Sequence, residues 1–259
     1  SERRQVLMKR LVDLLRINEV RFTAIILSVM TIAAVISLRG NLMSGGAVPC
    51  MYDICLVGVL HVVSTFCVPF VLFYILFVER YNQRPMQVIR EGSVSNVWKR
   101  SVVDLLILTV FFTLYVFVLT TIAGLVFTDR FYNWNELNSR CVAWSGRICE
   151  EQPSFVLLLI SYIVETFETF LVTGIVMLGV WWGTNKEWAG YLASIALITV
   201  DKTDKHKSLI FAKYYISGET YKKGLSISTN IIYPLLAAII VFALVNVLVR
   251  FKKKEFLGS

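Results

Sequence analysis

The sequence predicts an all-α, polytopic membrane protein. Of its 259 residues, 56% are hydrophobic and only 17% are charged, and the mean hydropathy is +0.66. A soluble domain normally carries about 25% charged residues. The apolar residues also gather in long runs, which leave no stretch long enough for a separate soluble domain. We therefore interpret residues 1–259 as one membrane domain.

Residues 1–20 precede the first apolar run and follow a different pattern. Leu7, Leu11 and Leu14 recur at helical spacing among five basic residues. This pattern is typical of a basic amphipathic helix that lies on an anionic membrane surface. The alternative is a frayed, solvated tail.

Six apolar runs follow as predicted membrane-spanning helices. A helix needs about 20 residues to cross a bilayer core of about 30 Å. Such segments must be helical, because lipid offers no hydrogen-bond partners to an open backbone. Five runs are long enough, whereas the fifth in chain order has only 13 residues. The predicted spans are residues 22–38, 54–77, 102–127, 155–181, 188–200 and 231–249.

The distribution of basic residues favours a plasma-membrane protein with both termini in the cytoplasm. With six crossings, the inner segments hold 15 Lys and Arg residues and the outer segments hold 10. Cytoplasmic loops are normally the ones enriched in Lys and Arg. Residues 128–154 and 201–230 are then outer loops, although 201–230 carries six lysines. If residues 188–200 did not cross, those lysines would be cytoplasmic, so charge alone barely separates the two topologies.

Residues 79–101 connect the second and third predicted spans and are more than a polar linker. Met86 and Ile89 are set among arginines, which indicates a short amphipathic helix that floats on the membrane or docks into a partner. Gly92 can end this helix, and one of the serines after it can cap the next. The sequence therefore predicts a helix, a turn and a capped helix.

These residues resemble the permease subunits of type-2 ATP-binding-cassette exporters. In that family the second span is followed by an acidic residue, a short helix, a turn with glycine or proline, and a basic residue that starts the third span. The corresponding positions here are Glu79, residues 86–90, Gly92-Ser93-Val94-Ser95 and Lys99. The last span of such permeases is followed by an aromatic, several basic residues and an acidic residue, and Phe251-Lys252-Lys253-Lys254-Glu255-Phe256 is similar.

The resemblance implies a pathway between two permeases, either two copies or one copy with a homologous partner, and a separate ATPase subunit docked on residues 80–97. No Gly-x-x-x-x-Gly-Lys-Ser/Thr phosphate-binding motif occurs in the chain. We therefore expect this chain to be no enzyme and to hold no cofactor, with ATP and Mg bound by the partner. The expected docking residues are Glu79, Arg84, Met86, Ile89 and Arg90.

Glu165 and Glu168 lie three residues apart in the fourth predicted span and share one helix face. An intramembrane carboxylate costs about 2.5–3.5 kcal/mol on insertion scales, so it normally faces a bundle interior or a water-filled cavity. We interpret the two residues as part of the substrate pathway. The alternative is a structural pair bonded to Thr, Tyr or His61 of another span.

Four of the five cysteines fall in or beside predicted outer segments, where an oxidising compartment permits disulfides: Cys50, Cys55, Cys141 and Cys149. The local pairs are Cys141–Cys149 and Cys50–Cys55, but pairing between loops and four free thiols also fit. With two histidines in the chain, we expect no His-based metal site.

Aromatic residues of the loop 128–154, among them Phe131, Trp134 and Trp144, are expected to anchor the membrane interface. Membrane lipid is thus an expected partner. Nucleic acid is not, because the basic residues behind the net charge of +8 lie in short stretches between apolar runs.

Two other function classes fit the sequence. A non-transporting signalling or immunity protein would have no ATPase partner, and an ion-coupled carrier would use Glu165 and Glu168 to bind protons or cations. The substrate stays open among peptides, lipids, glycans and drugs.

Overall fold

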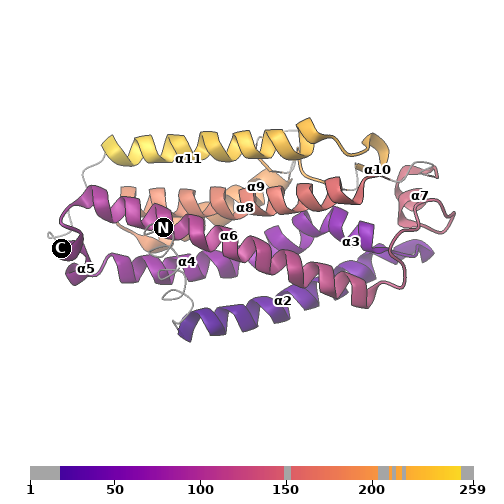
Figure 1. Ribbon diagram of the computed structural model, residues 1–259, viewed down its shortest axis with the longest axis horizontal. Helices are drawn as coiled ribbons and strands as arrows, with labels where there is room; N and C mark the ends of the chain where they lie inside the picture. The colour runs from indigo at the N-terminus through magenta and orange to yellow at the C-terminus, as the bar shows by residue number, and fades with distance from the viewer. Residues whose placement is uncertain (1–17, 149–152, 204–209, 212–213, 218–219, 252–259) are drawn as a thin grey trace, which may run out of the picture.

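The computed structural model describes residues 18–148, 153–203, 210–211, 214–217 and 220–251. They form a bundle of long helices that lie along its longest axis (Figure 1). Five segments are long and apolar enough to cross a membrane: Phe22–Leu42, Met51–Asn82, Val94–Phe127, Phe155–Thr184 and Ser228–Arg250. The protein is therefore a multi-pass helical membrane protein, as the sequence predicts. Most of the predicted interfacial helix falls in residues 1–17, outside the described residues.

The second membrane-crossing segment is assembled from three consecutive helices and the last from two, whereas the other three are single helices. In chain order the elements are α2 (Asn18–Leu42), the 3-10 turn η1 (Ser44–Gly46), α3 (Met51–Gly58), the π-helix η2 (Val59–Cys67), α4 (Val68–Asn82), α5 (Pro85–Glu91), α6 (Val94–Phe127), α7 (Arg140–Ser145), α8 (Phe155–Thr184), α9 (Glu187–Thr203), α10 (Thr220–Lys223), the π-helix η3 (Ser228–Ile232) and α11 (Tyr233–Phe251).

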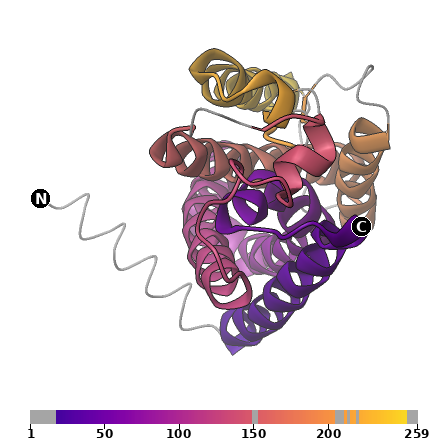
Figure 2. The same ribbon diagram turned by 90° about the vertical axis from the view of Figure 1, so that its right-hand side faces the viewer.

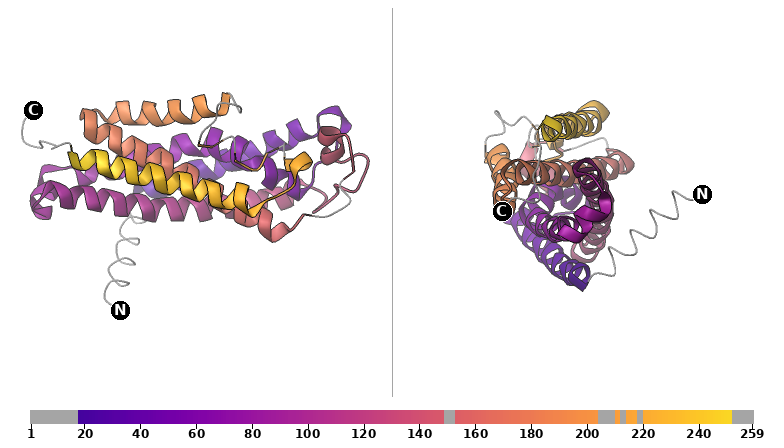
Figure 3. Two further views of the ribbon diagram at one scale, coloured as in Figure 1. Left: turned by 90° about the horizontal axis from the view of Figure 1, so that it is seen from above. Right: turned by 90° about the vertical axis from the view of Figure 1, so that its left-hand side faces the viewer.

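The two ends of the bundle are named here for their short helices. The α5 end carries α5, the turn between α8 and α9, and the C-terminal end of α11 (Figure 3). The α7 end carries α7 and α10 and faces the viewer in Figure 2. Successive long helices run in opposite directions between these ends, so the chain passes back and forth through the bundle.

Several helices extend beyond the predicted spans. The second segment reaches Asn82 instead of residue 77, and α6 begins at Val94 instead of residue 102. Apolar runs mark only the part of a helix that lipid can cover, so polar helix ends escape a boundary drawn from hydropathy. The connection predicted for residues 79–101 is thereby reduced to α5 and two short turns.

α9 is shorter than the other long helices and is not among the five candidate spans. Its 17 residues extend about 25 Å, less than a bilayer core of about 30 Å. It packs against α8, where the Ser194 hydroxyl donates to the carbonyl oxygen of Thr173 at 2.8 Å. Near its end, Lys202 Nζ donates to the carbonyl oxygen of Leu60 in η2 at 2.7 Å. α9 therefore stops between the two ends of the bundle.

The close approach of α8 and α9 at Gly190 gives the first prediction. A Cβ atom at this position would lie 2.4 Å from the carbonyl oxygen of Met177, which as backbone has little freedom to move. We expect Gly190→Ala to lower the free energy of unfolding by about 1–3 kcal/mol, measured by thermal unfolding in detergent. Gly40→Ala is the control, because nothing lies within 4 Å of a Cβ there. Equal stability of the two variants would contradict the close packing.

Candidate functional site

α5 presents two apolar side chains to the outside at one end of the bundle. Met86 is 83% exposed and Ile89 is 76% exposed. Three residues apart, they lie on the same face of the helix. Val88 packs instead against the hydrophobic core. One face of α5 therefore packs against the bundle, and the opposite face exposes the apolar side chains of Met86 and Ile89.

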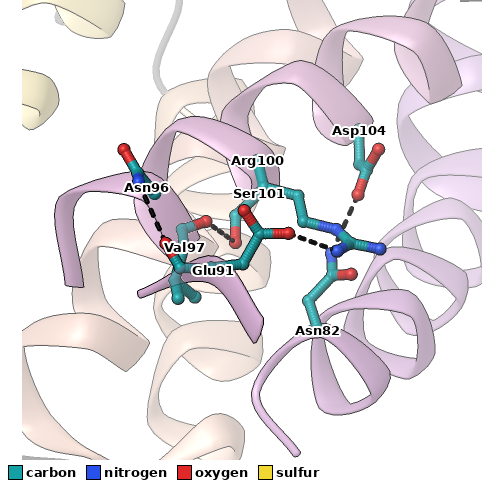
Figure 4. A network of polar contacts seen from close by, with 7 residues as sticks. All are labelled: Asn82, Glu91, Asn96, Val97, Arg100, Ser101 and Asp104. Carbon is teal, nitrogen blue, oxygen red and sulfur yellow. Dashed lines mark hydrogen bonds and ion pairs between the residues drawn. The ribbon is translucent and has the colours of Figure 1, made fainter. Parts of the chain in front are cut away.

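The turn after α5 holds it rigidly to α6. Gly92 adopts the left-handed conformation (φ 68°) that ends a helix, and the Ser93 hydroxyl accepts a hydrogen bond from the Asn96 backbone N–H at 3.2 Å. Figure 4 shows two further links: Asn96 Nδ2 donates to the carbonyl oxygen of Glu91 at 3.0 Å, and Arg100 forms an ion pair with the Glu91 carboxylate. This is the predicted helix, turn and capped helix.

Buried carboxylates behind α5 join α4, α6 and α8. Asn82 Nδ2 donates to Asp104 Oδ2 at 2.9 Å across α4 and α6 (Figure 4). Glu79 Oε1 accepts hydrogen bonds from Ser101 of α6 at 2.8 Å and from Trp182 of α8 at 3.4 Å. Buried hydrogen bonds therefore join three long helices next to α5.

The structure divides the five predicted docking residues into two groups. Glu79 is only 2% exposed, and its carboxylate organises the helices beneath the surface. The other four are exposed on α5 or next to it: Arg84, Met86, Ile89 and Arg90. The sequence alone suggests that Glu79 is exposed, because it is an acidic residue at the start of a polar stretch. Its partners Ser101 and Trp182 lie far away along the chain, so the sequence does not reveal its burial.

Glu165 holds a non-helical segment at the depth of the membrane. Both of its carboxylate oxygens accept the backbone N–H of Ile216, at 2.9 and 3.0 Å. The Tyr215 hydroxyl donates to the carbonyl oxygen of Glu165 at 3.1 Å. Since lipid provides no such acceptors, the carboxylate takes the place of a helical hydrogen-bond partner.

Glu168, one turn further along α8, has a different environment. It is fully buried, and neither carboxylate oxygen has a hydrogen-bond partner among the described residues. The Tyr215 hydroxyl is close, but it is hydrogen-bonded to Thr169 at 2.5 Å, and Asp201 adds a second negative charge nearby. Buried polar groups without partners are rare in proteins and call for an explanation. Of the two predicted pathway residues, Glu165 is the one that accepts a backbone hydrogen bond from another described segment.

Asp53, near the start of the second segment, organises the α7 end in the same manner. Its carboxylate accepts the Cys50 N–H at 2.8 Å, Trp134 Nε1 at 2.7 Å and the Tyr221 hydroxyl at 2.6 Å. Burial, followed by the charge of Asp53, raises the pKa of Tyr221 well above its usual value, so Tyr221 stays a neutral donor. The sequence gives no indication of this hydrogen-bond network around Asp53, because its residues are spread along the chain from Cys50 to Tyr221.

Trp134 corrects the prediction of an interfacial aromatic belt. Its side chain is 2% exposed and lies within the bundle, because Asp53 accepts its indole N–H. Phe131 is 46% exposed and Trp144 is 44% exposed, so these two rings do remain at the surface.

The structure describes four buried cysteines, Cys50, Cys55, Cys67 and Cys141, and the first three of them are free thiols. The pair Cys50–Cys55 is thus not formed. Cys149 lies outside the described residues, so the pair Cys141–Cys149 stays a prediction. Burial raises the pKa of the Cys50 thiol. Within the described part of the chain, no three His, Cys, Asp or Glu side chains are grouped so that they could hold a metal ion.

The contrast between the two glutamates gives the second prediction. Glu165→Leu leaves the Ile216 N–H without an acceptor, so we expect the free energy of unfolding to fall by about 1–3 kcal/mol. Glu168→Leu removes a buried carboxyl group that accepts no backbone hydrogen bond from the described residues, so stability should stay the same or rise. Thermal unfolding of both variants in one detergent measures the difference. An equal loss in both would contradict the assignment.

No protein-family model, curated protein or solved structure matches this chain. Any functional conclusion therefore rests on the geometry of these residues.

Proposed function

We propose that this chain is the permease subunit of an ATP-driven exporter of the ATP-binding-cassette type. The observation that carries the proposal is the exposed pair Met86 and Ile89 on a helix that is braced against the bundle. An apolar pair of this kind suits a groove on a partner subunit, and the arginines Arg84 and Arg90 beside it suit an acidic rim.

The hydrogen bonds beneath α5 supply the route by which force would enter the membrane. A partner ATPase, which binds ATP and Mg, closes on ATP binding and displaces α5. The Glu91–Arg100 ion pair passes the displacement to α6, and Glu79 passes it to α8. A second copy of the chain, or a homologous permease, completes the pathway between the two membrane domains.

The proposal requires α5 and the end of α11 to share the cytoplasm, so the chain must cross the membrane six times. α9 stops near Leu60, so the proposal requires the chain between α9 and η3 to complete the fifth crossing. Two contacts support this route: Ile216 is held by Glu165 within the bundle, and Tyr221 reaches Asp53 at the α7 end.

The six-pass topology gives the third prediction. Single cysteines replace Met86, Leu137 or Arg250 in a chain whose five native cysteines are changed to serine; all three positions are exposed. In intact cells a membrane-impermeant maleimide should label the cysteine of Leu137→Cys. It should label those of Met86→Cys and Arg250→Cys only after permeabilisation. Labelling of Met86→Cys and Arg250→Cys from opposite sides would contradict the sixth crossing and with it the exporter.

Within this proposal Glu168 faces the transported substrate or its counter-ion during the cycle, whereas Glu165 keeps the non-helical segment in place. A buried carboxyl group at the position of Glu168 also fits an ion-coupled carrier, which works without an ATPase. The presence or absence of an ATPase partner separates the two functions.

The docking surface gives the fourth prediction. The tagged chain is purified from its native membranes in mild detergent, and co-purified proteins are identified by mass spectrometry and assayed for ATP hydrolysis. We expect an ATPase subunit with the wild-type chain and at least a tenfold loss with Met86→Asp/Ile89→Asp, because a docked carboxylate would have to leave water.

Leu137→Asp is the matched control. Leu137 is 79% exposed in the connection at the α7 end, so the same change of an exposed apolar side chain to Asp should leave the ATPase bound. An ATPase that stays bound to the double variant would reject α5 as its docking site. If the wild-type chain captured no ATPase, the carrier would be the better assignment.

A further inference from the structure

An apolar groove lies between α8 and α11 near the α5 end of the bundle. Its volume is about 310 Å³. The side chains that line it are apolar, apart from the indole of Trp182, and they include Val176, Gly179 and Gly183 of α8 and Val245, Leu248 and Val249 of α11. Water in a buried site needs two to four polar partners, and this lining offers very few. An apolar occupant therefore fits the groove better than water.

The two glycines of α8 explain why a groove forms here. A Cβ atom at Gly179 would lie 2.5 Å from Val245, so α11 approaches α8 closely at this turn. One turn further on, Gly183 again lacks a side chain, and the space beside it stays open. Trp98 of α6 donates its indole N–H to Asn246 of α11 at 2.9 Å and packs against Trp182 of α8 with ring centroids 5.0 Å apart. α6 thus holds both walls of the groove in position.

The charges near the groove indicate what the occupant carries. Arg250 follows the lining residue Val249 directly and is exposed, and Lys186 is exposed in the turn after α8. The sequence continues beyond Arg250 with Lys252, Lys253 and Lys254. Basic pockets between membrane helices bind anionic lipid head groups, and an arginine binds phosphate through two parallel hydrogen bonds.

We propose that the groove is a binding site for one anionic glycerophospholipid of the leaflet at the α5 end. One acyl chain lies between α8 and α11, along the roughly 10 Å of α8 from Val176 to Gly183. Its phosphate is held by Arg250. Because Trp98 and Trp182 connect this site to Ser101 and Glu79, the bound lipid braces α11 against the helices that support α5. The site does not depend on the chain having an ATPase partner.

Lipid selectivity gives the fifth prediction. The purified chain is supplied with equal amounts of phosphatidylglycerol and phosphatidylcholine, and the bound lipid is identified by native mass spectrometry. The wild-type chain should retain one phosphatidylglycerol in preference to phosphatidylcholine. Arg250→Gln should lower that preference by about fivefold and still retain lipid, because each basic residue near a membrane surface contributes a factor of this size. Arg147→Gln is the control: it removes an exposed arginine at the α7 end and should change nothing.

Filling the groove tests its apolar part. Gly183→Leu should abolish lipid retention, and Leu248→Trp fills the same space from α11 at a position that is 67% exposed, in case the first variant does not fold. Unchanged lipid retention in the filled variants, or no preference for phosphatidylglycerol in the wild-type chain, would overturn the proposal. So would a dimer of the lipid-free chain that the filled variants abolish, since a second copy would then be the occupant.

Discussion

The structure depends on buried carboxylates that accept hydrogen bonds where lipid supplies none. An N–H group outside a helix costs several kcal/mol at membrane depth unless the protein provides an acceptor. Glu165 provides it for Ile216, and Asp201 accepts the N–H groups of Ile210 and Phe211 at 3.2 and 2.8 Å. The backbone N–H groups of Ile210, Phe211 and Ile216 are therefore paired within the protein although none of these residues lies in a helix. An acidic residue in a membrane span is in this case a structural necessity before it is a sign of transport.

The carboxylates serve different purposes at the two ends of the bundle. At the α5 end, Glu79 and Asp104 connect helix to helix, so that α4, α6 and α8 are joined by buried hydrogen bonds. Towards the α7 end, Asp53 and Glu165 connect helices to irregular segments. The two ends of the bundle therefore differ in what their carboxylates connect.

The sequence predicts the parts of this fold that are local. Long apolar runs reveal the five candidate spans, and Gly92 with Ser93 marks the turn between α5 and α6. The sequence cannot reveal the burial of Glu79 or Trp134, because the burial of each side chain depends on hydrogen-bond partners from distant parts of the chain. The 13-residue apolar run 188–200 predicted that the fifth helix is short. The contact between the end of α9 and Leu60 could not be predicted, because it is made by Lys202, a charged residue that a hydropathy criterion leaves outside a span.

The position of Glu168 connects these observations. Beyond α9, the backbone N–H groups of Ile210, Phe211 and Ile216 are bonded to the carboxylates of Asp201 and Glu165 rather than to a helical hydrogen-bond ladder. Tyr215 of that chain lies against Glu168, whose oxygens have no hydrogen bond among the described residues. Non-helical backbone at membrane depth occurs where it is buried in protein or lines a water-filled cavity. Tyr215 and Ile216 are buried in protein, which is the first of these situations, and the two glutamates of α8 are the polar groups beside them.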